Sequence, residues 1–296
     1  MGRKLNLLGI DFEDWYHPEL IKKYHRLETY EPIVVNAIDK IIDWLHQNDT
    51  YATFFVVGEL LEFKPELLDK IIDNGHEIGF HSMSHTRLDA PNYKEIFSTE
   101  LKKFSDLTNN KSKGFRAPSF SLSQSTSWAI DILESHGYTY DSSIVPAKTR
   151  LYGVENAQKT PYFISSESLE KNSSSAKLLE FPLLTTQFLT KQIPAGGGFF
   201  LRTLPLGITR SAIQSINKIN QPATFYIHSW ELAPELMPKI SLPFIDNFIT
   251  FYNIKKALQK MTKLIKEFPF TSFNRYIQEN KNNLNKYNKP KEFNQS

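Results

Sequence analysis

The chain has 296 residues, of which 40% are hydrophobic and 23% are charged, as is typical of a globular protein with a large buried core. Its formal net charge of +3 is too small to indicate a nucleic-acid partner. It contains no cysteine, which excludes disulfides, zinc ribbons and a cysteine nucleophile.

The first residues predict a β-strand. The apolar run at residues 5–10 is too short for an export signal, and acidic residues follow it directly. No segment approaches the ~18 apolar residues that a membrane span needs. We therefore expect a cytoplasmic location and no transmembrane segment, and the sequence makes no prediction of oligomeric state.

Segments typical of strands and helices alternate along the chain. Continuous apolar or β-rich runs predict strands, and apolar residues spaced by three and four predict helices. The predicted strands are 5–10, 52–58, 76–80, 114–116, 138–141, 178–182 and 223–228. The predicted helices are 32–46, 64–74, 95–109, 125–135 and 252–268. This alternation favours an α/β fold, either a parallel (β/α) barrel or a doubly wound sheet.

Residues 150–200 are expected to be irregular. Within them, residues 165–175 are rich in Ser, Glu, Lys and Asn and predict a surface loop. The run 194–200 holds three consecutive glycines without the strand and helix of a nucleotide-binding loop, so it predicts a bend or a turn that lines a pocket. We expect one domain over residues 1–275, which includes a C-terminal helical segment, and a loosely ordered tail over 276–296.

The pair His81 and His85 is the most informative local pattern. Two histidines four residues apart can bind one metal ion if the backbone curls after the first. An isolated pair is more often two unrelated surface histidines. Here an acidic cluster, Asp11, Glu13 and Asp14, lies upstream at the end of the first apolar run. The combination favours a metal site.

Five polar residues fall at the ends of predicted strands, namely Asp11, His81, Arg116, Asp141 and His228. The carboxyl ends of parallel strands in a barrel meet on one face, where barrel enzymes gather catalytic residues from several strands. Polar residues are common at strand ends, but five in succession favour a single site on that face. Two histidines, a carboxylate, a second acid and a distant histidine are the components of a hydrolytic metal site.

These motifs resemble those of the polysaccharide deacetylase, or NodB-homology, family of carbohydrate esterases, in a branch with an Asp-x-Glu-Asp first motif. Residues 10–17 resemble the first motif, residues 81–85 match His-Ser/Thr-x-x-His, and residues 115–120 match Arg-x-Pro. Residues 140–143 and 225–231 resemble the fourth and fifth motif regions, the latter with its late histidine. The resemblance implies a deformed (β/α) barrel, a divalent metal that is usually zinc, and hydrolysis of an N-acyl amide on a sugar.

The first motif leaves two assignments of its acids open. Side chains two apart on a strand share a face, which favours Asp11 as general base and Glu13 as metal ligand. If the strand ends at Glu13, the turn brings Asp14 onto the metal and leaves Glu13 as base. Matching Glu13 and Asp14 to the family's adjacent acids gives this second arrangement. His81 and His85 are metal ligands in both.

Three further residues receive catalytic roles. We predict that Arg116 orients the base carboxylate through charge-assisted hydrogen bonds. His228 is the predicted general acid, which protonates the departing amine. Asp141 either holds a catalytic histidine in its protonated form or caps a turn.

Five residues are assigned to substrate binding. His17 lies near the acidic cluster, and Pro118 belongs to the Arg-x-Pro motif. Trp15, Phe199 and Trp230 offer aromatic surfaces for a sugar ring or an acyl methyl group. A structural role for His17 and a place in the core for the aromatic residues are equally good interpretations.

The sequence therefore predicts a metal-dependent hydrolase of carbon–nitrogen bonds other than peptide bonds, which removes an N-acetyl or other N-acyl group from a sugar. The substrate is a polysaccharide or glycan intermediate, because the branch resembles proteins of surface-polysaccharide biosynthesis. One alternative is an amidohydrolase or deformylase that acts on a small non-polymeric amide. Another is a non-catalytic glycan-binding protein on the same fold, although the retained acids and His228 argue against it.

Overall fold

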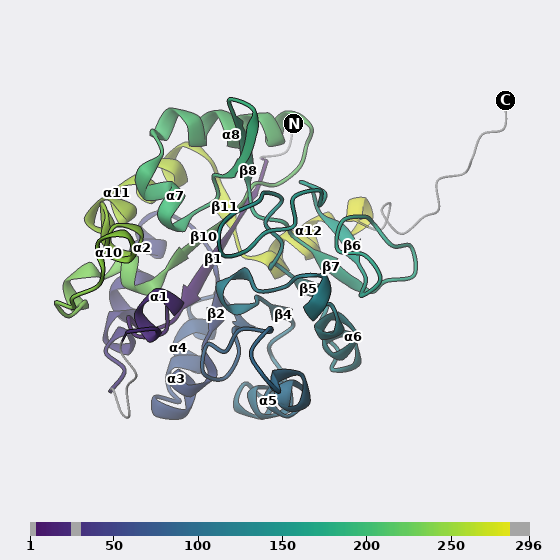
Figure 1. Cartoon of the computed structure of the whole chain (residues 1–296), viewed down its shortest axis with the longest axis horizontal. Coiled ribbons are helices and arrows are strands. Elements are labelled where there is room, and N and C mark those ends of the chain that lie inside the picture. Colours follow the sequence, from purple (N-terminus) through teal and green to yellow (C-terminus); the bar gives the residue numbers. More distant parts are fainter. Residues whose placement is uncertain (1–3, 25–30, 285–296) are drawn as a thin grey trace, which may run out of the picture.

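The structure, a computed structural model, describes residues 4–24 and 31–284 (Figure 1). Its central feature is a curved parallel sheet whose strands are hydrogen-bonded in the order β10, β1, β2, β3, β4, β5 and β7. In that order the strands span Thr224–His228, Asn6–Phe12, Thr53–Val56, Glu77–Phe80, Gly114–Phe115, Tyr140–Asp141 and Leu178–Glu180. Two short strands extend the sheet, because β6 (Tyr162–Ile164) pairs antiparallel with β7 and β11 (Phe270–Thr271) pairs parallel with β1.

The sheet closes into a barrel through the chain that follows β7. The amide of Phe181 donates to the carbonyl of Asp141 in β5 over 2.9 Å. Three residues later, the amide of Leu184 donates to the carbonyl of Thr224 in β10 over 3.0 Å. This irregular segment bridges the two edges of the sheet, so the barrel is deformed rather than made of regular strands all round. The predicted deformed (β/α) barrel is confirmed.

The glycine-rich run also lies against β10. The amide of Tyr226 donates to the carbonyl of Gly196 over 2.7 Å. A Cβ on Gly197 would lie 1.9 Å from the carbonyl oxygen of Tyr226, and the φ of Gly197 is +143°. Only glycine allows this close approach of two backbones. The run therefore packs against β10 and leads into the helix at Gly198–Thr203, and it is not a nucleotide-binding loop.

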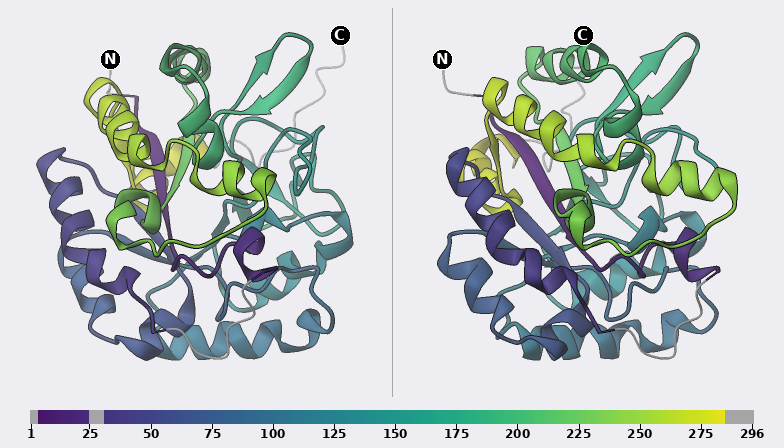
Figure 2. Two further views of the ribbon diagram at one scale, coloured as in Figure 1. Left: turned by 60° about the vertical axis from the view of Figure 1, so that its left-hand side comes forward. Right: turned by 90° about the vertical axis from the view of Figure 1, so that its left-hand side faces the viewer.

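Helices cover the outer face of the barrel (Figures 1 and 2). The longer ones are α2 (Ile38–Gln47), α5 (Tyr93–Leu107), α6 (Trp128–Ser135), α8 (Leu206–Lys218), α10 (Phe244–Phe251) and α11 (Ile254–Glu267). The shorter ones are α1 (Glu19–Lys22), α3 (Gly58–Phe63), α4 (Leu67–Asp73), α7 (Gly198–Thr203) and α9 (Ser229–Leu232). Four 3₁₀ turns, η1 (Val34–Ala37), η2 (Pro118–Phe120), η3 (Gln124–Thr126) and η4 (Pro234–Leu236), and a hairpin of β8 (Thr185–Phe188) and β9 (Lys191–Pro194) complete the described fold.

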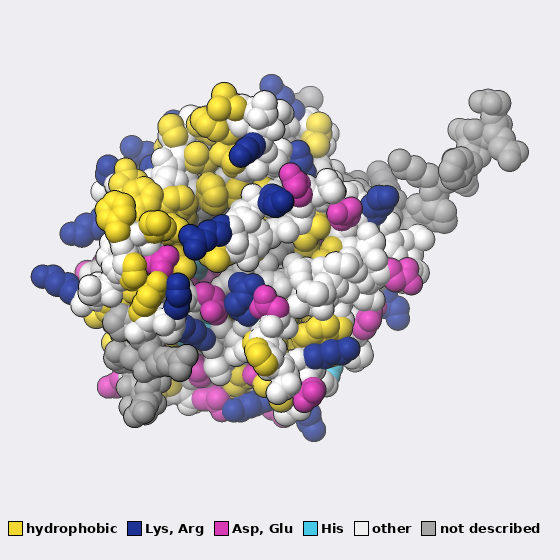
Figure 3. Space-filling view, viewed as in Figure 1, with side chains coloured by type: hydrophobic (Ala, Val, Ile, Leu, Met, Phe, Trp, Pro, Cys, Tyr) yellow, Lys and Arg dark blue, Asp and Glu magenta, His cyan; other side chains and the backbone are white. Residues whose placement is uncertain are grey.

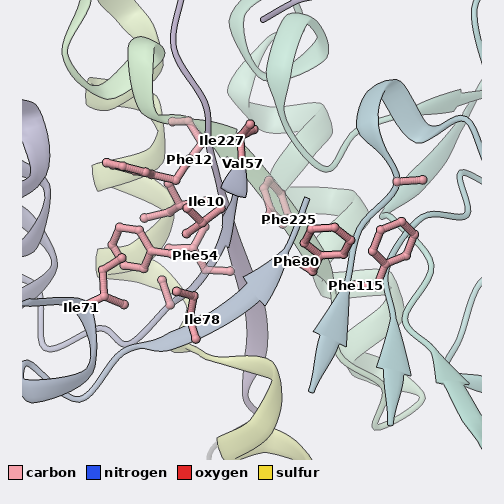
Figure 4. Close-up of a cluster of buried hydrophobic side chains, with 14 of the residues drawn as sticks. Ile10, Phe12, Phe54, Val57, Ile71, Ile78, Phe80, Phe115, Phe225 and Ile227 are labelled. Atoms are coloured by element: carbon pink, nitrogen blue, oxygen red, sulfur yellow. The ribbon is translucent and has the colours of Figure 1, made fainter. Parts of the chain in front are cut away.

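The main core lies between the sheet and the surrounding helices. Figure 4 shows part of it, where Ile10, Phe12, Phe54 and Phe225 of the strands belong to the same buried cluster as Ile71 of α4. These strand residues occupy alternate positions, as expected for side chains that point to one face of a sheet. The opposite positions point into the barrel, so both faces of the strands are buried. This explains why the strands are continuous apolar runs.

The barrel interior has its own aromatic core, which the C-terminal helix α12 (Phe273–Leu284) closes. Phe55 and Tyr140 of the strands pack with Phe273 of α12, and the rings of Tyr140 and Phe273 stack at 5.3 Å. The amide of Phe273 donates to Thr53 Oγ1 over 3.0 Å. Because Thr53 begins β2, α12 lies at the amino-terminal end of the barrel. The opposite, carboxyl-terminal end remains available for a pocket.

Several elements differ from those predicted. Helix α8 was not predicted, and β6 and the β8–β9 hairpin lie in the region expected to be irregular. The tail expected from residue 276 was wrong in its first part, because α12 continues to Leu284 and buries Tyr276. The rest of the predicted tail, residues 285–296, lies outside the described part of the chain. Across residues 4–24 and 31–284, no helix combines the length and the apolar character needed to cross a membrane.

Candidate active site

A pocket of ≈ 280 Å³ opens at the carboxyl ends of the strands. Its polar lining includes Asp11, Glu13, His81, His85 and His228. These residues come from the ends of β1, β3 and β10 and from the segments that follow them. The structure thus brings together five of the residues that the sequence analysis singled out.

Glu13, His81 and His85 form a buried group that can hold a metal ion. Each offers one ligand atom, and these atoms lie within 4.8 Å of one another. Oε2 of Glu13 lies 2.6 Å from Nε2 of His85 and 3.9 Å from Nε2 of His81. Nδ1 of His81 lies 2.7 Å from the carbonyl oxygen of Arg116, to which it donates as the protonated ring nitrogen. This hydrogen bond leaves the lone pair of Nε2 free to bind a metal.

The backbone around the two histidines has the curl that the pattern required. Ser82 and His85 have φ values of +60° and +53°, in the left-handed region. The amide of Gly58 donates to the carbonyl of Ser82 over 2.9 Å, which fixes the turn against α3. A Cβ on Gly58 would lie 2.3 Å from Sδ of Met83, so a larger residue here would displace the Met83 side chain.

The protonation states of the three residues suit a divalent cation. Burial lowers the pKa of His81 to about 4 and also lowers the pKa of His85, so both imidazoles are neutral at neutral pH. Burial would raise the pKa of Glu13, but the neighbouring imidazoles outweigh burial and hold it below its ordinary value. Oε2 of Glu13 is buried, and the Nε2 atoms of the two histidines lie beside it. A buried carboxylate oxygen and two neutral imidazoles fit a cation such as Zn²⁺.

Asp11 is held by Arg116. Nη1 of Arg116 donates to Oδ1 of Asp11 over 2.6 Å. Nε and Nη2 of the same guanidinium donate to the carbonyl and hydroxyl of Ser142, each over 2.9 Å, and its planar face lies 4.1 Å from the ring centre of Phe55. Arg116 is fully buried, so four contacts fix it in one orientation. A Cβ on Gly9 would lie 2.4 Å from Nη1, which leaves room for glycine alone.

Asp14 is not part of the group formed by Glu13, His81 and His85. Its Oδ1 accepts a hydrogen bond from the amide of Trp15 and its Oδ2 accepts one from the amide of Val34, each over 2.7 Å. Both oxygens are therefore used to attach the turn after β1 to η1. The assignment of Asp14 as metal ligand and Glu13 as base is corrected, since Glu13 is the acid beside the histidines.

His228 is bound to an acid that the sequence analysis did not select. Nδ1 of His228 lies 2.7 Å from Oε2 of Glu231, three residues further along the chain. The other oxygen of Glu231 forms a 2.7 Å ion pair with Nε of the buried Arg202. Burial would lower the pKa of His228, but the Glu231 carboxylate outweighs burial and raises it to about 9. His228 therefore carries a proton at neutral pH.

Asp141 does not contact His228 and does not line the pocket. Its Oδ1 accepts a 2.6 Å hydrogen bond from Ser143, whose hydroxyl oxygen accepts one from the amide of Ala117. Two roles were predicted for Asp141. The structure supports the role in a turn and contradicts the role of holding a catalytic histidine in its protonated form. Asp141 stabilises the turn beside Arg116. Burial raises the pKa of Asp141 and of its neighbour Glu180, so this pair retains a proton.

The predicted substrate-binding residues divide into two groups. Phe199 and Trp230 line the pocket. Nε1 of Trp230 donates to Oε1 of Glu13 over 3.0 Å, and its ring stacks on His228 at 4.6 Å. Trp230 therefore orients Glu13 and His228 as well as forming a wall of the pocket.

Trp15, His17 and Pro118 are buried and do not line the pocket, which corrects their assignment to substrate binding. Trp15 packs in a small core with Ile21. The imidazole of His17 stacks at 5.8 Å behind that of His85, and its Nε2 lies 2.8 Å from Glu59. Pro118 begins η2, whose next two residues reach the pocket in its place.

Several pocket residues were not predicted. Arg150, Leu151 and Tyr152 belong to a segment without a regular pattern, so no local signal indicated their place. Tyr226 lies two residues before His228 on β10 and thus faces the same way. The sequence could have predicted that Tyr226 lines the pocket, because side chains two apart on a strand share a face.

Comparisons with known proteins show which families and proteins the chain is similar to. Residues 25–140 match the family described as polysaccharide deacetylase, and residues 142–278 match one described as a domain of unknown function (DUF3473). The peptidoglycan deacetylase of Helicobacter pylori is 31% identical over 97 residues, which cover 32% of each chain. The peptidoglycan-N-acetylglucosamine deacetylase of Bacillus cereus is 27% identical over 121 residues, 35% of this chain and 43% of that protein. The chain thus spans less than half the length of these relatives.

A solved structure has the same fold over nearly the whole length. The structure, described as a polysaccharide deacetylase from Mycobacterium smegmatis, superposes with a TM-score of 0.55 at 15% identity. The match covers 94% of this chain and 91% of the other. At this identity the likeness establishes the fold, and the chemistry depends on the residues of the pocket.

Proposed function

Because residues 25–140 match the polysaccharide deacetylase family, we propose that the chain is a metal-dependent hydrolase that removes an N-acyl group from a sugar of a glycan. The observation that carries the proposal is the buried group of Glu13, His81 and His85 at the floor of a pocket, with Asp11 and His228 beside it. The peptidoglycan deacetylases among its relatives support an N-acetylated sugar as substrate. A role in surface-polysaccharide biosynthesis and a cytoplasmic location stay predictions from the sequence.

Glu13, His81 and His85 would hold the metal, for which we propose Zn²⁺. One carboxylate and two imidazoles form a donor set of the kind found in catalytic zinc sites. When bound, such an ion supplies Lewis acidity, which makes water a better nucleophile and an amide carbonyl a better electrophile. Trp230 keeps the Glu13 carboxylate in place through its 3.0 Å hydrogen bond.

Asp11 serves as the general base. Its hydrogen bond from Arg116 fixes one oxygen of the carboxylate, and Asp11 lines the pocket. The carboxylate accepts a proton from the attacking water as oxygen adds to the amide carbon. Arg116 keeps the carboxylate oriented before that step.

His228 serves as the general acid. Breaking the C–N bond leaves the electron pair on the sugar nitrogen, which must receive a proton to depart as an amine. His228 holds a proton at neutral pH because Glu231 stabilises the imidazolium. The products are the free carboxylic acid and the amino sugar. The ring of Phe199 offers an apolar surface on which the C–H face of a sugar ring packs.

Acetate release tests the proposal directly. The purified chain, loaded with Zn²⁺, is incubated with N-acetylated chito-oligosaccharides and with isolated peptidoglycan, and free acetate is measured. We expect release by wild type, loss on chelation, and a reduction of roughly 10²-fold or more in Asp11→Asn with metal still bound, as is typical for removal of a general base. Binding of these glycans without any release would instead identify a glycan-binding protein.

The same assay distinguishes the small-amide alternative. Formate release from a formylated sugar, without acetate release, would assign the protein as a deformylase. Activity on small non-sugar amides alone would remove the glycan from the proposal. The acyl group that the pocket accepts stays a prediction until these substrates are compared.

A further inference from the structure

Helix α10 exposes large apolar side chains beside the mouth of the pocket. Phe244 is 85% exposed, Ile245 is 59% exposed, and Phe248 and Tyr252 are 42% and 43% exposed. Figure 3 shows hydrophobic side chains gathered over the region of α10 and α7. We call these four residues of α10 and the turn after it the apolar rim. Contiguous exposed apolar surface of this kind marks a site of interaction.

The apolar rim is continuous with the pocket and rigidly attached to it. The ring of Phe248 lies 5.9 Å from that of Phe199, which lines the pocket. On the other side of α10, Ile249 and Thr250 line the pocket themselves. Arg202 donates to the carbonyls of both residues and to that of Tyr252. Whatever covers the rim is therefore held against the pocket mouth.

The charges around the apolar rim are positive. Residues 236–266 contain six lysines and a single acid, Asp246, and the acids on either side of this range, Glu235 and Glu267, form ion pairs with Lys40 and Arg210. Asp246 is buried, and its carboxylate accepts a 2.7 Å hydrogen bond from the hydroxyl of Tyr24. Lys255 and Lys256 at the start of α11 are exposed. An anionic partner therefore fits this surface.

We propose that the apolar rim docks the protein on an anionic lipid bilayer, with Phe244 and Ile245 inserted at the interface and the lysines against the headgroups. An apolar helix face flanked by cations is the pattern of helices that lie in the membrane interface. A second copy of the chain is disfavoured, because a symmetric contact would bring the lysines of both copies together. Helix α10 projects at the edge of the molecule (Figure 2), which suits insertion into a fluid surface. Docking of this kind does not depend on the hydrolase activity.

Vesicle flotation tests the proposal. Full-length protein is mixed with vesicles of phosphatidylcholine and phosphatidylglycerol, or of phosphatidylcholine alone. We expect flotation with the anionic vesicles that weakens with salt, and a loss of binding of roughly tenfold or more when Phe244→Ser and Ile245→Ser are combined. Leu189→Ser is the matched control, because Leu189 is 83% exposed on the β8–β9 hairpin, away from the rim. Lys255→Gln with Lys256→Gln should weaken binding by roughly fivefold for each lysine, which supplies a second test if the serine variant does not fold.

Three results would overturn docking on a bilayer. Wild type that does not float with anionic vesicles excludes it. Flotation that survives both pairs of substitutions places the membrane contact elsewhere. A wild-type dimer that the serine pair converts to a monomer assigns the rim to a second copy. Acetate release from a water-soluble oligosaccharide is measured in parallel, so that failure of the proposed activity is distinguished from failure of docking.

Discussion

Asp11 and His228 are register partners on the neighbouring parallel strands β1 and β10. Their positions at the ends of these strands bring the proposed base and the proposed acid to one edge of the sheet. Glu13 follows β1, and its Oε1 lies 3.9 Å from Nε2 of His228. The strand register therefore sets the spacing of the two groups that we propose to transfer protons beside Glu13, His81 and His85.

Substitution of the proposed metal ligands should change metal binding, whereas substitution of Asp14 should change stability. We expect Glu13→Gln and His85→Ala to lose tight binding of Zn²⁺ while keeping the fold, because the barrel core does not depend on the ion. Asp14→Asn should keep the metal and lose roughly 1–3 kcal/mol of stability, since one of its two backbone amides loses its acceptor. Elemental analysis and thermal unfolding of the purified variants give both quantities. Loss of metal in Asp14→Asn would return Asp14 to the ligand set.

Gly9 tests the contact between Arg116 and Asp11. We expect Gly9→Ala to displace the guanidinium, because the added Cβ would lie 2.4 Å from Nη1. Turnover should fall by roughly tenfold or more at unchanged metal content, with a stability loss of about 1–3 kcal/mol from overpacking. Gly207→Ala is the control, since its Cβ would meet nothing within 4 Å. Full turnover in Gly9→Ala would show that the orientation of Arg116 does not matter for the base.

The pH dependence of turnover should report on His228. Because the acid must be protonated, the rate falls as pH rises through its pKa, which Glu231 raises to about 9. Glu231→Gln removes the carboxylate that stabilises the imidazolium, so we expect the alkaline limb to move to lower pH. Glu235→Gln, which changes an exposed acid nearby, should leave the limb in place. The measurement is kcat against pH, and an unchanged limb in Glu231→Gln would separate Glu231 from the acid.

The buried pair of Asp141 and Glu180 should make stability fall as pH rises. Burial raises the pKa of both carboxyls, so the folded protein keeps a proton that the unfolded chain releases above its ordinary carboxyl pKa. The stabilisation is full below that value and is lost as pH rises through the folded pKa. Glu180→Gln removes one of the two shifted carboxyls, so the variant should lose less stability than wild type as pH rises above the ordinary carboxyl pKa.

Chemical unfolding at several pH values measures the effect, with the exposed Glu167→Gln as control. Parallel curves for wild type and Glu180→Gln would mean that the pair does not hold a proton in the folded state.

Much of the site could be predicted because its residues lie at strand ends. His81, His85 and Glu13 needed only the curl after β3 and the end of β1 to meet. Glu231, the partner of His228, was not predicted, because Asp141 lies at a strand end and Glu231 does not. Glu231 gave a local signal of its own, since an acid three residues after the residue that begins a helix is typical of a capping box.

The missed helices carried weaker signals. In α8, Thr209, Ala212 and Ile213 are buried at helical spacing, but polar residues separate them. In α12, the buried Phe273, Tyr276 and Leu284 form a narrow stripe in an Asn- and Lys-rich sequence that resembles a disordered tail. The packing of this stripe against the aromatic barrel interior is a long-range contact, so local composition could not predict it.

The arrangement of β1 also bears on how the chain folds as it leaves the ribosome. Apart from β2, the strands that pair with β1 are β10 and β11, so most of the polypeptide is synthesised before β1 gains its second neighbour. Until then β1 keeps one unpaired edge, and until α12 emerges the aromatic interior stays open at one end. Contacts of such long sequence separation slow folding and expose partly formed chains to aggregation. We therefore expect the nascent barrel to need protection, such as that of a holding chaperone, until the last helix is complete.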